Sequence, residues 1–96
     1  MEQLTLDGKT FRADIIPLPT SAILVIQGPK GILGCGYLSI ETADKLGHAL
    51  AVVKGVSTYD QMLSATVVNV SAAAKALGVE PGMTGRDALL RLNQEK

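Results

Sequence analysis

The 96-residue sequence contains no tryptophan, one cysteine (Cys35) and one histidine (His48). A single cysteine cannot form a disulfide within the chain. One cysteine with one histidine is also too few to complete the ligand set of a structural zinc site. We therefore expect no metal, no cofactor and a cytoplasmic location, where thiols stay reduced.

Long runs of one kind of residue are also missing. Nine basic and nine acidic residues cancel to a formal net charge of zero, and the two signs are interspersed. Without a basic run to neutralise phosphates, nucleic-acid binding is not expected. The longest apolar run, AILVI at 22–26, is far shorter than the roughly 18 residues of a membrane helix. The start, MEQLTLDGK, lacks the basic and apolar regions of a signal peptide, so we expect a soluble protein without a membrane partner.

Aromatic side chains are scarce as well, because only Phe11, Tyr37 and Tyr59 are present in a sequence that is 47% hydrophobic. The core must therefore consist of Leu, Ile, Val, Ala and Met. The length predicts a single domain spanning residues 1–96, and a chain of this size buries roughly 60–65% of its unfolded surface. Small aliphatic domains often share apolar surface with a second copy, so we expect a homo-oligomer.

The first half of the sequence is typical of strands. Asp7-Gly8 lies between two alternating runs, which is a strong hairpin signal. The second run continues to Pro17, and the apolar stretch at 22–27 predicts a strand covered on both faces. Gly28-Pro29-Lys30-Gly31 has the pattern of a type I turn, so 22–27 and 32–38 are predicted to be antiparallel neighbours. Alternation in the latter puts Gly34 and Gly36 on one face, as a notch, and Leu33, Cys35 and Tyr37 on the other.

The second half is mainly helical in pattern. Ser39 is a good N-cap for a helix through about 50, and 50–55 predicts a fifth strand. Thr58 with Gln61, and Thr84 with Asp87, have the spacing of capping boxes. Residues 66–70 fit a strand or a helix, and a helix from about Asn69 to a C-terminal Gly78 is preferred. The predicted fold class is α+β: a four-stranded, mostly antiparallel meander, then a helix, a fifth strand and two or three short C-terminal helices packed on one sheet face.

Three segments, CGYL, KGVSTYDQMLSA and LGVEPGMTGRDALLRL, resemble the YunC-like family of small bacterial and archaeal proteins of unknown function. The resemblance runs from about Gly31 to Leu92, and its most specific part is GMTGRDALLRL. It implies a fold and a soluble location, but no activity. The residues of this chain that match the family pattern are Cys35, Gly36, Gly55, Val56, Asp60, Gly82, Met83, Gly85, Arg86, Ala88 and Leu89.

Cys35 has two interpretations. It could be a nucleophilic or redox-sensing thiol, which requires solvent access and a nearby cation or helix N-terminus, with Lys30 or Arg86 as candidate cations. It could instead pack as a small hydrophobic residue, as most free cysteines do. The second interpretation is preferred because the predicted neighbours are apolar and no acid or histidine is set beside the thiol.

The remaining motifs also have structural interpretations. Residues 34–39 have the outline G-x-G-x-x-S, but the third glycine of a dinucleotide fingerprint is missing. Residues 82–87 could bind an anion at a glycine-flanked helix start with Arg86 assisting, or could be a turn and N-cap whose anion is Asp87. Asp60 fits a first-turn carboxylate and His48 a partner of Asp44.

No acid, base and nucleophile can be assembled into one catalytic set. The main hypothesis is therefore a non-enzymatic, oligomeric protein that binds a partner or small ligand. The alternative is an enzyme or redox protein that depends on Cys35 and acts on a small anionic substrate. The candidate ligand-binding residues are Cys35, Gly34, Gly36, Arg86 and Gly85.

Overall fold

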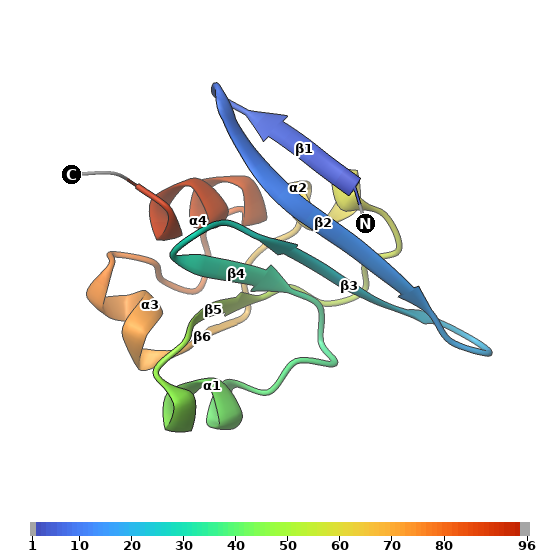
Figure 1. Cartoon of the computed structure of the whole chain (residues 1–96). Helices are drawn as coiled ribbons and strands as arrows, with labels where there is room; N and C mark the ends of the chain where they lie inside the picture. Colours follow the sequence, from blue (N-terminus) through green and yellow to red (C-terminus); the bar gives the residue numbers. More distant parts are fainter. Residues whose placement is uncertain (1, 95–96) are drawn as a thin grey trace.

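The computed structural model describes residues 2–94 and contains one six-stranded sheet with the strands in chain order (Figure 1). All five neighbouring pairs of strands in the sheet are consecutive in the chain. Only the pair β4 and β5 is parallel, and the other four pairs are antiparallel. The α+β prediction with an N-terminal meander is therefore confirmed. The strands are β1 (Glu2–Leu6), β2 (Lys9–Pro17), β3 (Ala22–Gln27), β4 (Gly31–Gly34), β5 (Ala49–Val52) and β6 (Asn69–Val70).

Local signals in the sequence set the two predicted turns. Asp7 and Gly8 both have positive φ (50° and 80°), as a two-residue type I′ hairpin requires. At the second turn the Gly28 amide donates to the carbonyl of Gly31 over 3.0 Å, and β3 pairs antiparallel with β4 as predicted.

Four short helices have N-caps from the expected residue type. The hydroxyls of Ser39, Thr58, Ser71 and Thr84 each accept a hydrogen bond from an amide in the following first turn. The helices are α1 (Ile40–Leu46), α2 (Tyr59–Ser64), α3 (Ala72–Ala76) and α4 (Gly85–Leu92).

The helices divide between the two faces of the sheet (Figure 1). The three C-terminal helices pack on one face, where Met62 of α2, Ala74 of α3 and Leu89 of α4 join the main core with Leu33 and Ala51 of the sheet. The first helix, α1, covers the other face and forms a separate small cluster around Ala43, Leu50 and Val52. The α1 crossover connects the two parallel strands, β4 and β5.

Three sequence predictions were wrong in detail. The first helix ends at Leu46, with Gly47 as a left-handed C-cap, instead of continuing to about residue 50. Asn69-Val70 is not the start of a helix but a short strand, because its backbone pairs with β5; α3 begins only after the N-cap Ser71. The fourth strand ends at Gly34 instead of continuing to 38. The chain folds back there, so that a Cβ on Gly34 would lie only 2.1 Å from Cδ1 of Leu38.

Candidate functional site

A hollow lies at the carboxyl ends of the parallel strands β4 and β5. The cavity has a volume of about 470 Å³, within the range of roughly 300–1,000 Å³ that is usual for small-molecule sites. We call it the Cys35 cavity; it is lined by Thr20, Ser21, Ala22, Cys35, Gly36, Tyr37, Gly55, Val56 and Ser57.

Backbone pairing brings the two ends of the parallel strands together. The amide of Val53 donates to the carbonyl of Gly34 over 2.9 Å, just past the last paired residues. The amide of Cys35 donates to the carbonyl of Leu24 over 3.1 Å, which joins the same point to β3. Three segments line the cavity: residues 20–22 at the start of β3, residues 35–37 after β4 and residues 55–57 after β5.

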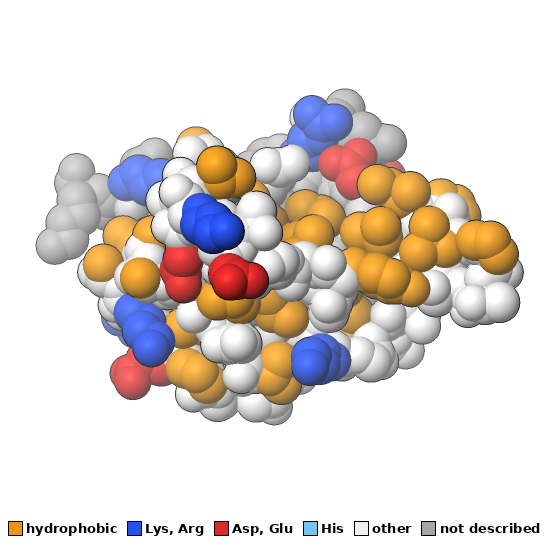
Figure 2. Space-filling model, turned by 90° about the horizontal axis from the view of Figure 1, so that it is seen from below, with side chains coloured by type: hydrophobic (Ala, Val, Ile, Leu, Met, Phe, Trp, Pro, Cys, Tyr) orange, Lys and Arg blue, Asp and Glu red, His pale blue; other side chains and the backbone are white. Residues whose placement is uncertain are grey.

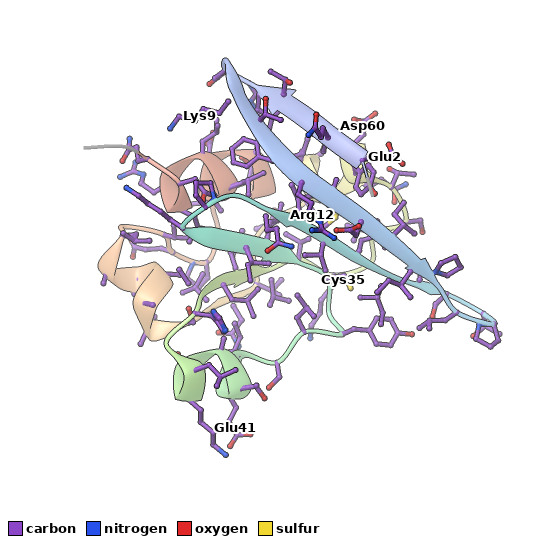
Figure 3. All side chains as sticks on the ribbon, viewed as in Figure 1. Glu2, Lys9, Arg12, Cys35, Glu41 and Asp60 are labelled. Carbon is purple, nitrogen blue, oxygen red and sulfur yellow. The ribbon has the colours of Figure 1, made fainter. Side chains whose placement is uncertain are left out.

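The thiol of Cys35 forms part of the cavity wall and of the core. Its side chain is only 4% exposed, and the amide of Leu24 donates a hydrogen bond to Sγ over 3.4 Å. Figure 3 shows Cys35 at the end of β4, with the labelled carboxylates of Glu2, Glu41 and Asp60 well away from it. The burial agrees with the packing interpretation.

Hydroxyl groups dominate the polar lining. Thr20, Ser21, Tyr37 and Ser57 each contribute one, while Ala22 and Val56 contribute apolar surface. Ser21 and Tyr37 are hydrogen-bonded to each other through their hydroxyls, across the rim of the cavity. Within residues 2–94, the lining contains no acidic, basic or imidazole side chain.

The glycine notch predicted from strand alternation was wrong. Leu38 fills the space beside Gly34, which is buried. Gly36 lies in an exposed turn after the strand, and the aliphatic part of Lys54 passes over it, 3.3 Å from the position that a Cβ would take. Tyr37 likewise leaves the Leu33–Cys35 face, and its side chain is 57% exposed. Only Gly36 of the two glycines reaches the cavity.

The fold does not place Arg86 or Gly85 beside Cys35. Arg86 donates to the carboxylate of Asp7 over 2.8 Å, which connects α4 to the first hairpin turn. Gly85 lies where α2 and α4 cross, and its amide donates to the carbonyl of Ala65 over 2.8 Å. Neither residue lines the Cys35 cavity, so the suggested cooperation between Cys35 and Arg86 has no support in the geometry.

Three backbone amides of the glycine-flanked turn at 82–87 already donate to protein acceptors. The amide of Gly82 donates to the carbonyl of Val67 over 2.9 Å. The amide of Asp87 donates to the N-cap hydroxyl of Thr84 over 3.1 Å, and that of Gly85 is engaged with Ala65. The interpretation as a turn with an N-cap therefore describes this segment.

The other singled-out residues also have structural roles. Met62 is fully buried, and Met83 is partly buried against the core. Asp44 accepts a hydrogen bond from the amide of Ala72 over 2.8 Å, so its carboxylate serves α3 instead of the predicted partner His48. On α2, burial first and then the charges of Glu2 and Asp14 raise the pKa of Tyr59 above its ordinary value.

Two buried polar side chains gave no signal in the sequence. Ser71 donates to the carbonyl of His48 and accepts from the amide of Leu50, which fixes β5 against α3. Asn93 closes α4 and reaches the turn between β3 and β4, where its amide oxygen accepts from the Lys30 and Gly31 amides over 2.8 and 3.0 Å. Both positions depend on contacts between distant segments, which no local spacing encodes.

Residues 2–94 contain no cluster of His, Cys, Asp and Glu side chains that could hold a metal ion. In the same part of the chain, no helix has the length and apolar character needed to cross a bilayer.

Comparisons with known proteins place the chain in a family. A domain of unknown function, DUF1805, matches residues 34–92. The chain is 32% identical over 93 residues to the uncharacterised protein YunC of Bacillus subtilis, covering 93% of this chain and 92% of that protein. The crystal structure of a protein of unknown function, TA1206 from Thermoplasma acidophilum, has a TM-score of 0.91 and 37% identity over 96% of this chain and 90% of that one. The resemblance stated from the sequence is therefore confirmed, and the chain belongs to the DUF1805 family that includes YunC.

Proposed function

We propose that this protein is a non-enzymatic binding protein whose ligand is a small molecule held in the Cys35 cavity. The observation that carries the proposal is the cavity itself, about 470 Å³ in volume and lined by hydroxyls, small residues and one thiol. Such a mixture of apolar wall and a few placed polar groups is typical of ligand sites.

The lining favours binding over catalysis. A nucleophilic thiol in a catalytic set is activated by a general base within hydrogen-bond reach. Among the described residues that line the cavity, the polar side chains are hydroxyls and the thiol. The alternative function, a Cys35-dependent enzyme or redox protein, loses the support that Arg86 was expected to give, because Arg86 pairs with Asp7.

A cavity-filling variant tests the proposal. Ala22 lines the cavity from β3, so the additional atoms of Ala22→Leu would occupy ligand space. Fragment binding is measured by amide chemical shifts in solution. We expect fragments to shift the resonances of Gly36 and Gly55 in the wild type, and Ala22→Leu to weaken their binding by about tenfold or more.

Ala72→Leu is the matched control, because Ala72 is exposed on α3 and does not line the cavity. It should bind the fragments as the wild type does. Binding that is equal in the two leucine variants, or fragments that collect at another surface, would show that the cavity is not the ligand site.

We also propose that the protein is a homo-oligomer. Ile15, Ile16 and Tyr37 are 40%, 53% and 57% exposed. Figure 2 shows hydrophobic side chains gathered at the end of the molecule that the β2–β3 hairpin occupies. A second copy is the proposed occupant, since a chain with a formal net charge of zero meets no net repulsion from its own copy. Sedimentation equilibrium at micromolar concentration checks this, and a 10.0 kDa particle would contradict it.

A cytoplasmic location remains part of the proposal. Its support is the single cysteine, which is free and buried, since reducing compartments preserve free thiols.

A further inference from the structure

We propose that the ligand of the Cys35 cavity is a small organic acid whose carboxylate lies at the rim beside Lys54. This inference rests on the proposed function and adds the chemical class of the ligand. Three observations carry it: the position of one lysine, the absence of an ion-pair partner for this lysine within residues 2–94, and the composition of the cavity lining.

Lys54 lies next to the Cys35 cavity, and it also lines a neighbouring hollow that contains Asp60. Its residue precedes Gly55, which lines the cavity, and its side chain passes over Gly36, which also lines it. Three of its carbons, Cγ, Cδ and Cε, lie 3.3, 3.8 and 3.8 Å from the position that a Cβ on Gly36 would take. The aliphatic part is thus packed on the turn, and long lysine side chains of this kind keep the ammonium group in water.

The ammonium group of Lys54 has no ion-pair partner within the described part of the chain. Arg12 pairs with Asp14, and Arg86 pairs with Asp7. The ammonium group of Lys9 donates to the carbonyl of Asn93. By contrast, Lys54 makes no ion pair or hydrogen bond with any residue in 2–94. A cation left unpaired beside a cavity without acidic lining residues favours an anionic ligand over a neutral or cationic one.

The rest of the lining fits the remainder of such a molecule. The hydroxyls and the exposed backbone of the rim can donate or accept, so they do not select a charge. Within residues 2–94, the amides of Gly36 and Gly55 donate to no protein group, which leaves them available to carboxylate oxygens. The apolar surface of Ala22 and Val56 suits a short aliphatic or similar apolar portion.

Hexanoate and hexanamide form a matched pair of probes, because they have the same length and differ in charge. Each is titrated into the labelled protein while the amide resonances of Gly36 and Gly55 are followed. We expect hexanoate to bind more tightly than hexanamide, and added salt to reduce the difference.

Lys54→Met removes the charge and keeps an aliphatic stem over Gly36. We expect it to weaken hexanoate binding about fivefold, as the loss of one solvent-exposed ion pair would, and to leave hexanamide unchanged. Lys45→Met is the control, because Lys45 is exposed on α1 and does not line the cavity.

The outcomes separate the two proposals. Equal binding of the two probes at the cavity, or equal effects of the two lysine variants, would overturn the organic-acid assignment and leave the binding function standing. If neither probe shifts any resonance of the cavity lining, the organic-acid assignment fails, and the fragment test with Ala22→Leu decides the binding function separately.

Discussion

Gly85→Ala is expected to be among the most destabilising single substitutions in this chain. An added Cβ would lie 2.0 Å from the carbonyl oxygen of Met62, 3.0 Å from the Met62 carbonyl carbon and 3.2 Å from Cδ2 of Leu33. The first two atoms belong to the backbone of α2, which cannot rotate away as a side chain could. The α2 and α4 helices must therefore separate, and the core between them must open.

Overpacking of this kind costs about 3 kcal/mol at the upper end of its usual range. In a domain of this size, that loss lowers the midpoint of thermal unfolding by roughly 12–24 °C. Helix propensity alone predicts the opposite sign, because alanine is favoured over glycine by about 0.5–1 kcal/mol. Thermal and urea unfolding of the variant distinguish the two expectations.

The neighbouring substitution Arg86→Ala is the control for Gly85→Ala. It removes an exposed ion pair with Asp7 and should cost about 1 kcal/mol or less. If Gly85→Ala were as stable as the wild type, α2 and α4 would not approach as closely as the structure shows.

Asn93→Ala is the second substitution with a large expected effect. Asn93 is 3% exposed, and its amide oxygen accepts from the Lys30 and Gly31 amides. Its amide nitrogen donates to the carbonyls of Leu89 and Gly31 over 3.0 and 3.4 Å. The substitution leaves the amides of Lys30 and Gly31 without this acceptor, while the Gly31 carbonyl keeps the Gly28 amide. A buried unsatisfied group costs about 1–3 kcal/mol.

We expect a total loss of about 3 kcal/mol in the free energy of unfolding for Asn93→Ala, since at least two backbone donors lose their acceptor. Urea unfolding measures it. The control is Asn69→Ala, because Asn69 is exposed and accepts only from the amide of Val70 next to it. Similar stability of the two alanine variants would mean that Asn93 does not secure the turn between β3 and β4.

The sequence was informative about the fold where the signal is local. The Asp7-Gly8 hairpin, the turn at 28–31 and the N-caps Ser39 and Thr84 are local signals, and each was predicted correctly. By contrast, Asn93 acts on a turn more than sixty residues away in the sequence. Nothing in its neighbourhood predicts that partner.

The same distinction explains the errors. Asn69-Val70 has an ambiguous pattern, and it becomes a strand only because β5 offers a free edge. The strand ending at Gly34 was extended too far, because the return of Leu38 over Gly34 is a contact that alternation alone cannot show. Cys35 and Gly36, which were candidates from the sequence, line the proposed cavity, but the sequence could not place Lys54 and Ala22 beside them, since three separate segments meet there.

The rate at which Cys35 reacts with iodoacetamide tests the central claim most directly. If Cys35 is part of the wall of a binding cavity, the folded protein should react more slowly than the unfolded chain, because the side chain is 4% exposed. A fragment that shifts the Gly36 and Gly55 resonances should slow the reaction further by covering the thiol. A folded protein that reacts faster than the unfolded chain, or a rate unaffected by the bound fragment, would contradict the account.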